Sequence, residues 1–312
     1  MAVSEFNLIQ RYFSAQQLTS SVNRLGIGDD CALMSIPAGY ELAITTDTMV
    51  EGVHFFAGAE PGALGHKLLA VNLSDLAAMG AKPVSVSLAL TLPSVDEEWL
   101  GAFSKGFLAL ARDFSVDLIG GDTTAGPLTL TVNALGLIPE GQALKRSGAK
   151  VGDLIFVTGK LGEAGLGLKI NTGYDCMSPV AALSQFNHPN PRVKEGLAIR
   201  EYASACIDLS DGLASDLKHI AEKSSVSAKI DWDSLPLSEE VSAYIEATND
   251  WALPLSAGDD YELCFTVSPE NIASINIECT QVGVIEEGAG LKVLRLGVIE
   301  DLKVNGFEHF ST

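Results

Sequence analysis

Five short segments of the chain place aspartate beside glycine, serine or threonine, and they are spread over much of its length. The segments are Gly28-Asp29-Asp30, Thr45-Thr46-Asp47-Thr48, Asn72-Leu73-Ser74-Asp75, Gly120-Gly121-Asp122-Thr123-Thr124 and Asp208-Leu209-Ser210-Asp211-Gly212. Small neighbours leave a carboxylate approachable, and hydroxyl or backbone oxygens add ligands for hard cations such as Mg²⁺, which commonly share a site with substrate phosphates. A fold that uses all five segments must bring distant parts of the chain to one multi-metal phosphate site.

Size and composition favour a two-domain protein. The chain has 312 residues, more than one hydrophobic core usually supports, and 47% of them are hydrophobic. The longest apolar runs, such as residues 84–92, are too short to span a bilayer. The first twenty residues show no basic start followed by an apolar segment and a cleavage site. We therefore expect a cytoplasmic protein with no membrane partner.

The charge of the chain excludes one class of partner. Forty acidic residues against 20 Lys and Arg give a formal net charge of −20, which repels nucleic acid. The same charge repels ATP or a phosphate ester unless cations neutralise part of the site. Solubility alone explains the acidity, so the grouping of acids is the separate observation. The five cysteines are odd in number and widely spaced, and we assign them no chemistry.

Apolar patterns predict secondary structure in both halves of the chain. Strands are expected at residues 41–50, 83–92, 128–138, 153–158, 261–267 and 281–286. Helices are expected at residues 63–79, 95–114, 162–170, 192–203 and 212–223. A polar, glycine-containing stretch at 141–152 separates the halves. Because no regular parallel βαβ rhythm appears, we predict an α+β fold of two mixed α/β domains, residues 1–147 and 148–312.

Each aspartate segment also has a structural interpretation. Asp47 would lie near a strand end, where aspartate is often a turn residue. Asp75 lies inside a predicted helix and shares a face with Asn72, so that face is either solvated or turned towards a cation. Asp122 follows two glycines in what reads as a strand-to-turn segment.

The second half of the chain offers the same choice. Ser210 or Asp211 can cap the helix that follows, which explains one acid but leaves Asp208 without a role. Arg146 suits phosphate geometry or is a solvent-exposed linker residue. His54 is a structural hydrogen-bonding residue or a ligand.

Several familiar site patterns are missing or weak. The sequence has no P-loop, protein-kinase signature or Gly-x-Ser-x-Gly elbow. It also shows no obvious nucleophile–histidine unit, so no covalent nucleophile is assigned. A second Gly-Asp-Asp at residues 258–260 repeats the one at 28–30; chance is the preferred explanation of this echo, and convergent use for ligands is the alternative.

The order and wording of these segments resemble the thiamine-monophosphate kinases, which are grouped with aminoimidazole ribonucleotide synthetases and selenophosphate synthetases. The resemblance runs from Glu5-Phe6 through residues 26–30 to Phe307. The most specific matches are Thr46-Asp47-Thr48-Met49-Val50-Glu51-Gly52-Val53-His54-Phe55 and Val71-Asn72-Leu73-Ser74-Asp75-Leu76-Ala77-Ala78-Met79-Gly80-Ala81.

The resemblance implies a reaction and a set of ligands. The family transfers the γ-phosphoryl group of ATP directly, in line, onto thiamine monophosphate, with several Mg²⁺ ions and no phosphoenzyme. The implied metal ligands are Asp30, Thr45, Thr46, Asp47, Asp75, Asp122, Asp208 and Asp211. The implied ATP contacts are Gly121, Asp122, Arg146 and Ser210, and the implied thiamine monophosphate contacts are His54, Asp259 and Phe307. A homodimer formed through the N-terminal domains is implied as well.

The chain departs from the family pattern at two substrate positions. The family commonly has glutamate where Asp259 stands and tyrosine where Phe307 stands, so one acid is a methylene shorter and one ring lacks its hydroxyl.

Two alternative functions are open: another ATP-dependent member of the wider superfamily with a different small substrate, and a non-catalytic divalent-cation-binding protein. The first would differ most in its C-terminal substrate residues, and the second would leave Gly121, Arg146 and Ser210 without a role.

Overall fold

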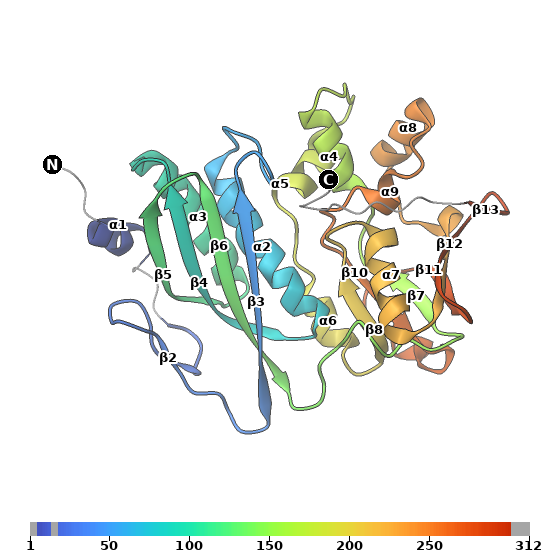
Figure 1. Cartoon of the computed structure of the whole chain (residues 1–312), viewed down its shortest axis with the longest axis horizontal. Coiled ribbons are helices and arrows are strands. Elements are labelled where there is room, and N and C mark those ends of the chain that lie inside the picture. The colour runs from blue at the N-terminus through green and yellow to red at the C-terminus, as the bar shows by residue number, and fades with distance from the viewer. Residues whose placement is uncertain (1–4, 14–17, 301–312) are drawn as a thin grey trace. The chain divides into compact units, whose positions relative to one another are not determined.

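The computed structural model describes residues 5–13 and 18–300, which form two compact units (Figure 1). Unit 1 comprises Met1–Leu76 and Ala81–Gly141, and unit 2 comprises Ala77–Gly80 and Gln142–Thr312. Both units mix helices with sheets, so the predicted α+β class is confirmed. Among the described residues, no helix combines the length and apolar character that a membrane crossing requires.

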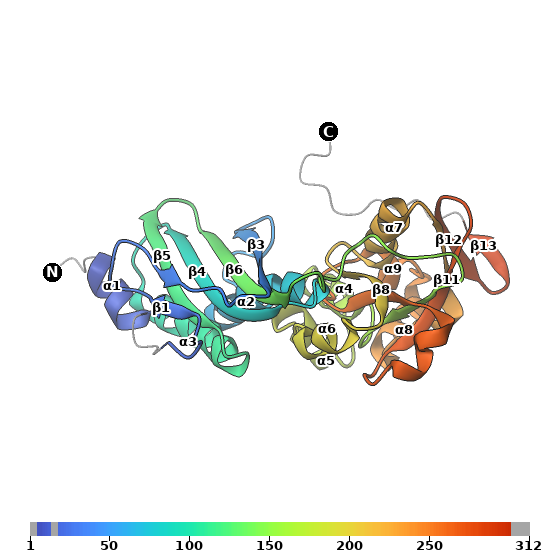
Figure 2. The same cartoon turned by 90° about the horizontal axis from the view of Figure 1, so that it is seen from below.

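Unit 1 is built on a four-stranded sheet in the order β3-β6-β4-β5. Its strands are β3 (Tyr40–Val50), β4 (Lys82–Leu92), β5 (Asp117–Ala125) and β6 (Thr129–Pro139). Strand β6 is antiparallel to both β3 and β4, whereas β4 and β5 are parallel. Helices α2 (Pro61–Ala78) and α3 (Glu97–Asp113) lie on one face of this sheet (Figures 1 and 2). Smaller elements complete the unit: α1 (Glu5–Tyr12), β1 (Asn23–Leu25) and β2 (Leu33–Met34).

Local sequence explains how helix α3 begins and how it packs against α2. The carboxylate of Asp96 caps α3 by accepting the N–H groups of Glu98 and Trp99, both at 3.0 Å. Helices α2 and α3 approach closely, because a Cβ on Gly65 would lie 2.2 Å from the Phe103 carbonyl oxygen. The predicted helices at 63–79 and 95–114 are therefore confirmed, and their observed bounds differ by a few residues.

Unit 2 is built on a seven-stranded sheet in the order β13-β12-β9-β11-β7-β10-β8. Its strands are β7 (Leu154–Val157), β8 (Ala203–Asp208), β9 (Ser227–Asp231), β10 (Leu263–Val267), β11 (Thr280–Glu286), β12 (Gly290–Arg295) and β13 (Val298–Glu300). Its helices are α4 (Glu163–Asn171), α5 (Val180–Asn187), α6 (Val193–Ile199), α7 (Leu213–Ser224), α8 (Glu239–Thr248) and α9 (Leu253–Ser256), with short 3₁₀ turns at Trp232–Ser234 and Pro269–Ser274.

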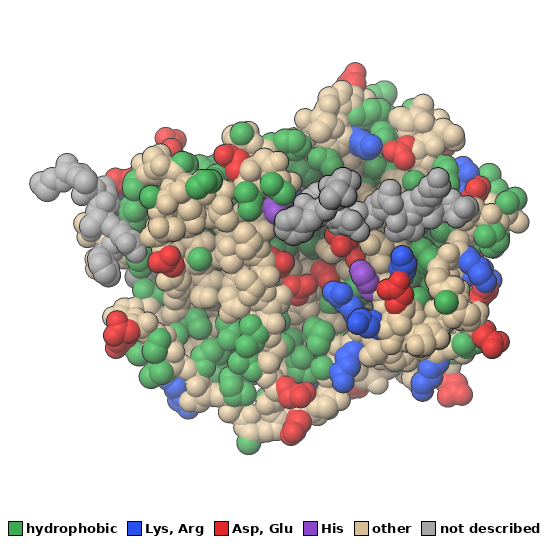
Figure 3. Space-filling view, in the orientation of Figure 1, with side chains coloured by type: hydrophobic (Ala, Val, Ile, Leu, Met, Phe, Trp, Pro, Cys, Tyr) green, Lys and Arg blue, Asp and Glu red, His purple; other side chains and the backbone are tan. Residues whose placement is uncertain are grey.

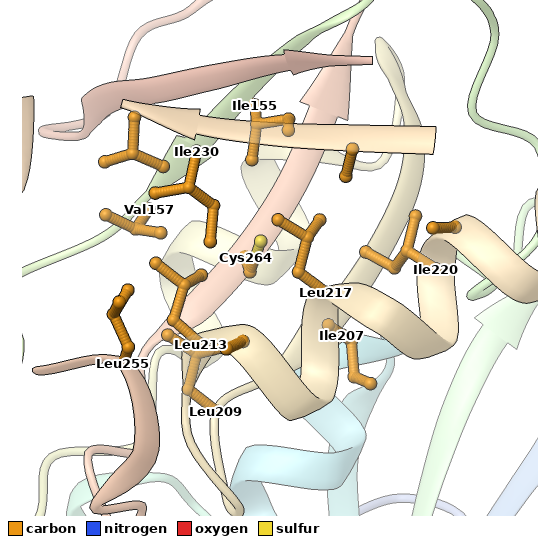
Figure 4. Close-up of a cluster of buried hydrophobic side chains, with 14 of the residues drawn as sticks. Ile155, Val157, Ile207, Leu209, Leu213, Leu217, Ile220, Ile230, Leu255 and Cys264 are labelled. Atoms are coloured by element: carbon orange, nitrogen blue, oxygen red, sulfur yellow. The ribbon is translucent and has the colours of Figure 1, made fainter. Parts of the chain in front are cut away.

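The main core of unit 2 lies between α7 and the sheet. Leu213, Leu217 and Ile220 project from successive turns of α7 towards Val157 and Cys264 (Figure 4). Periodicity of this kind places one apolar stripe of a helix against the core. The packing of this stripe therefore fixes the position of α7 against the sheet, and the helix begins immediately after the Asp208–Asp211 segment.

Two predictions about elements are wrong. The helix expected at 192–203 ends at Ile199, because residues from Ala203 onward pair with β10 as strand β8. The turn expected at Gly120–Thr124 is instead part of β5, which continues to Ala125 beside β4. A Cβ on Gly121 would lie 1.9 Å from the Leu88 carbonyl oxygen, so glycine is needed here for close strand approach. Both errors come from strand pairing that is distant in sequence.

Candidate active site

Two acids of unit 1 meet between strand β3 and helix α2. The hydroxyl of Thr45 donates a hydrogen bond to the carboxylate of Asp75. The amide of Asp47 donates to the side-chain oxygen of Asn72 at 3.2 Å. The predicted common face of Asn72 and Asp75 on the helix is thus turned towards β3, and it is occupied by polar partners.

The pairing of these carboxyl groups is electrostatically costly in the absence of a cation. Burial, the charge of Asp75 and a hydrogen bond between the two carboxyl groups together raise the pKa of Asp47 from 3.8 to about 7. Like charges that share a site favour a proton or a cation between them. The oxygens gathered here come from carboxyl, hydroxyl and amide groups, which are the ligands Mg²⁺ prefers. The residues present therefore fit a hard divalent cation.

Neighbouring site candidates on β3 point to opposite faces of the sheet. The side chain of Asn133 donates to the Thr46 hydroxyl at 2.7 Å and to the Thr45 carbonyl oxygen at 3.1 Å. The Thr46 hydroxyl is therefore held by β6, whereas the Thr45 hydroxyl points to α2. Because successive side chains of a strand point to opposite faces, the Thr46 hydroxyl points away from the Asp47 carboxylate. Thr46 could therefore share an ion with Asp47 only through its backbone oxygen.

Asp122 lies at the other edge of the same sheet. The strand register places Asp47, Val132, Leu88 and Gly121 in one row across the four strands. Three strand spacings of about 4.8 Å separate β3 from β5, or about 14 Å. Two ligands of one Mg²⁺ ion lie within about 4 Å of each other. Within one chain, the backbones of the strands that carry Asp47 and Asp122 thus lie farther apart than two ligands of one ion do.

Two further candidates of unit 1 lie in loops. Asp30 is exposed, and its amide donates to the side chain of Asp29 at 2.9 Å. His54 follows β3, and its Nδ1 accepts the amide of Val50 at 3.0 Å. The structural hydrogen bond that the sequence allows for His54 is therefore present. Nε2 is the other polar atom of this side chain.

Three acids of unit 2 gather where strand β8 leads into helix α7. Asp208 ends the strand and is only 4% exposed. The amide of Asp211 donates to the Asp216 carboxylate at 3.0 Å. Burial and the charges of Asp208 and Asp211 raise the pKa of Asp216 to about 8, against the opposing effects of the Asp211 amide and Arg146. The structure thus places Arg146 close enough to influence Asp216, the acid beside the predicted ligands Asp208 and Asp211.

The expected cap of α7 is wrong. The N-cap residue is Gly212, at a φ of 105°, and no side chain caps the helix from that position. A Cβ there would lie 2.8 Å from the Leu255 carbonyl oxygen, so the tight turn needs glycine. The N-cap position of α7 is therefore held by neither Ser210 nor Asp211.

The segment that carries Asp259 is bonded to the segment that carries Ser210. The amide of Asp259 donates to the Ser210 carbonyl oxygen at 2.9 Å, and the amide of Tyr261 donates to the Leu209 carbonyl oxygen at 2.9 Å. The Tyr261 hydroxyl also donates to the Asp259 carboxylate at 3.0 Å. The remaining substrate candidate, Phe307, lies outside the described residues.

Sequence reasoning missed two polar residues of these clusters. Asn133 gives no local signal, because its role depends on the pairing of β3 with β6. Asp216 lies in the first turn of α7, where an acid is ordinarily explained by the helix dipole. Among the described residues, no group of three or more His, Cys, Asp or Glu side chains is already arranged as a metal site.

Comparison with known proteins supports the division into two domains of one family. Residues 28–138 match the AIR synthase related protein N-terminal domain, and residues 150–295 match the corresponding C-terminal domain. The thiamine-monophosphate kinase of Haemophilus influenzae is 45% identical over 325 residues, with 100% of this chain and 99% of that protein covered.

Solved structures give the same result. The crystal structure of thiamine-monophosphate kinase from Stenotrophomonas maltophilia K279a has 42% identity and a TM-score of 0.85, covering 94% of this chain and 97% of that one. A structure described as AaThiL complexed with AMPPCP and TMP has 31% identity and a TM-score of 0.80, covering 99% and 97%. The chain therefore belongs to the thiamine-monophosphate kinase family and is built from the two AIR synthase related domains.

Proposed function

We propose that this protein phosphorylates thiamine monophosphate at the expense of ATP, giving thiamine diphosphate and ADP. The similarity to named thiamine-monophosphate kinases over the whole chain supports the substrate. The observation that carries the chemistry is the half-buried Asp47–Asp75 pair, because two carboxyl groups that share a site favour a proton or a cation between them. Both reactants are anionic, so positive charge is needed where they meet.

The reaction needs positioning more than a strong base. An oxygen of the thiamine monophosphate phosphate bonds to the γ-phosphorus of ATP, and the bond from that phosphorus to the β,γ-bridging oxygen breaks, which releases ADP. A phosphate acceptor is already ionised near neutral pH. Bound Mg²⁺ supplies charge neutralisation and alignment in reactions of this kind. We accordingly assign no covalent nucleophile and no phosphoenzyme.

Each unit supplies its own residues to this reaction. In unit 1, Asp47 and Asp75 would hold cations, with Thr45, the backbone of Thr46, and Asp30 as further ligands. In unit 2, Asp208 and Asp211 would hold cations beside the nucleotide contacts Ser210 and Arg146. Asp259, His54 and Phe307 would bind thiamine monophosphate, and Gly121 would give the nucleotide close access to the backbone. Several Mg²⁺ ions are therefore proposed.

We further propose a homodimer formed through the sheet of unit 1. Tyr40, Leu42 and Ile44 project from β3 on the face that lacks α2 and α3, and Ile44 is 60% exposed. Hydrophobic side chains gather over β3 and β6 on this face (Figure 3). An exposed apolar edge strand is a liability that a partner commonly covers.

The position of Asp122 supports the same dimer. A two-fold axis that sets β3 of one copy beside β5 of the other would place the strand that carries Asp122 of the second copy next to the strand that carries Asp47 of the first, twice per dimer. This arrangement resolves the separation of about 14 Å between the two strands within one chain. The ion bound by Asp47 would then be shared between two copies.

The location of the enzyme is proposed on chemical grounds. ATP is the phosphoryl donor, and the cysteines are all free, with Cys206 and Cys264 buried. Buried free thiols suit a reducing compartment. We therefore place the protein in the cytoplasm.

Product analysis tests the proposed function. The full chain is incubated with ATP, Mg²⁺ and, in separate reactions, thiamine monophosphate, thiamine or aminoimidazole ribonucleotide. Chromatography should detect thiamine diphosphate and ADP in the first reaction alone. ADP formation with a different acceptor would favour another superfamily activity, and cation-dependent stabilisation without any turnover would favour the cation-binding alternative.

A further inference from the structure

The substrate segment of unit 2 has an unusual backbone. Gly258, Asp259 and Tyr261 have φ values of 71°, 61° and 49°. Residues with a side chain seldom adopt this left-handed conformation, because Cβ then crowds the following carbonyl oxygen. Two such residues within three positions persist only where surrounding contacts fix them. The conformation of this segment therefore depends on what holds it.

Asp260 is the residue in the middle of this segment, and its side chain turns into the unit. It is 2% exposed, and its two carboxyl oxygens accept the amide of Gly162 at 2.9 and 3.1 Å. The amide of Ala164 bonds to the same carboxyl group. The N-cap of α4 is Gly162 itself, which offers no side chain. Asp260 thus caps helix α4 from a distant part of the sequence.

The backbone of Asp260 is held as well. The side-chain amide of Gln185, on α5, donates to the Asp260 carbonyl oxygen at 2.8 Å. On either side of it, the amides of Asp259 and Tyr261 bond to Ser210 and Leu209. One residue therefore connects two helices to the substrate segment, which is bonded in turn to the segment that carries Ser210.

We propose that Asp260 is a positioning residue, which fixes the left-handed turn so that Asp259 and Ser210 are held at a set spacing. In this role it couples the site for thiamine monophosphate to the site for the nucleotide without touching either substrate. The inference rests on the proposed function for its kinetic consequence, and on the hydrogen bonds alone for its structural one. The Gly-Asp-Asp at residues 258–260 thereby has two acids with different tasks.

The kinetic test compares Asp260→Ala with Asp260→Asn. Alanine removes both acceptor oxygens, whereas asparagine keeps one. A displacement of about 1 Å at a site can cost about 10²-fold in rate, so kcat/KM for thiamine monophosphate should fall by roughly that factor in the alanine variant. The asparagine variant should recover a large part of the loss. Gln185→Leu removes only the backbone contact and should raise KM by a smaller factor.

The matched control is Asp153→Asn. Asp153 is also a buried acid of unit 2, and it accepts the amide of Lys150 at 2.9 Å and the hydroxyl of Ser204 at 2.5 Å. It contacts neither the 208–212 nor the 257–262 segment through these bonds. This variant should keep the kinetic constants of the unsubstituted protein while it loses a comparable buried acid.

Hydrogen–deuterium exchange separates this inference from the proposed function. In Asp260→Ala, exchange should rise in peptides that cover residues 157–166, 205–215 and 255–263, in comparison with Asp153→Asn. A rise confined to the first peptide would show that Asp260 only caps α4, and would overturn the inference. Equal kcat/KM in the alanine variant and the control would overturn it also. If the unsubstituted protein forms no thiamine diphosphate, the proposed function is rejected. The exchange result would still decide the positioning role of Asp260.

Discussion

At the scale of single residues, the Asp47–Asp75 pair is the feature that most requires a cation. Asp47 is partly enclosed beside α2, and its pKa rises because burial and a second carboxyl group both disfavour its charge. The Thr45 hydroxyl donates to the Asp75 carboxylate, and the Asn72 side-chain oxygen accepts the backbone amide of Asp47. An ion bound here would replace a proton and would gain ligands that are already oriented.

The substitution Asp47→Asn tests this pair. Asparagine keeps the size of the side chain and removes its negative charge, so we expect Mg²⁺-dependent turnover to fall by about 10²-fold or more. The melting temperature of the metal-free protein should be unchanged or higher, because one buried charge is lost. Steady-state kinetics over a range of Mg²⁺ concentrations measures the effect. Asp113→Asn, at the exposed end of α3, is the control, and equal losses in the two variants would contradict the assignment.

Some of these residues could be predicted from the sequence and others could not. Asp47, Asp75, Asp208 and Asp211 are marked by small and hydroxyl-bearing neighbours, which is a local signal. Asn133 has no such signal, because only the pairing of β3 with β6 brings it to Thr46. Local patterns thus identify ligands better than they identify the residues that orient them.

At the scale of elements, strand β3 has two different faces. Thr45 and Asp47 face α2, while Tyr40, Leu42 and Ile44 project from the other face of the sheet and are exposed. Alternation along one strand therefore serves the cation site and the proposed dimer surface at once. A one-residue shift of register would exchange the two sets.

The substitution Ile44→Lys tests the dimer surface. A lysine at this position would carry charge into a surface that has to be apolar in the dimer, and the side chain is already exposed in the single chain. We expect the folded protein to sediment as a monomer, with its circular dichroism spectrum unchanged. Val151→Lys, at another exposed apolar residue, is the control. An unchanged sedimentation coefficient for Ile44→Lys would place the dimer interface elsewhere or remove it.

Elements with strong local patterns were predictable, and elements that depend on distant pairing were not. The helix expected at 63–79 has apolar residues at helical spacing, and Gly80, whose φ is 64°, follows shortly after its last residue, Ala78. No strand is predicted at residues 203–208, and the helix expected at 192–203 reaches the first of them, but pairing with β10 makes them a strand. The Gly120-Gly121 pair likewise reads as a turn, because the local sequence does not reveal the pairing of β5 with β4.

At the scale of the whole molecule, the proposed dimer makes each site depend on two chains. The strand order β3-β6-β4-β5 places Asp47 and Asp122 at opposite edges of one sheet. A symmetric pair of copies offers each Asp47 an Asp122 from its neighbour. The arrangement can be tested without a structure of the dimer.

Mixed dimers provide that test. Asp47→Asn and Asp122→Asn chains are co-expressed with different tags, and each variant alone should be inactive. If each site takes one acid from each copy, a mixed dimer has one intact site, and random pairing should restore about a quarter of the unsubstituted activity. If both acids come from the same chain, every site in the mixture carries one substitution. Activity at background level would therefore reject the shared site.

Stability should depend on pH in a direction set by two buried acids, Asp216 and Asp260, and the half-buried Asp47. Burial is the main cause that raises the pKa of Asp47 to about 7 and the pKa values of Asp216 and Asp260 to about 8. A folded-state pKa above the unfolded one favours folding at low pH, and this contribution is lost as the pH rises through 7 to 8. The melting temperature of the metal-free protein should thus fall by several degrees between about pH 6 and pH 9.

Added Mg²⁺ should reverse this trend. A cation competes with the protons of the same carboxyl groups, so it binds more tightly at higher pH. Its stabilising effect should be larger at about pH 9 than at pH 6, as differential scanning fluorimetry can show. A metal-free melting temperature that rises over this range would contradict the raised pKa values.

The central claim is that this chain moves the γ-phosphoryl group of ATP onto thiamine monophosphate. Phosphorus NMR follows ATP, ADP, thiamine monophosphate and thiamine diphosphate in one tube with the full chain and Mg²⁺. The account predicts that ADP and thiamine diphosphate appear at equal rates, with no inorganic phosphate, and that Asp47→Asn stops both. Release of inorganic phosphate without thiamine diphosphate, or no change in any resonance, would contradict it.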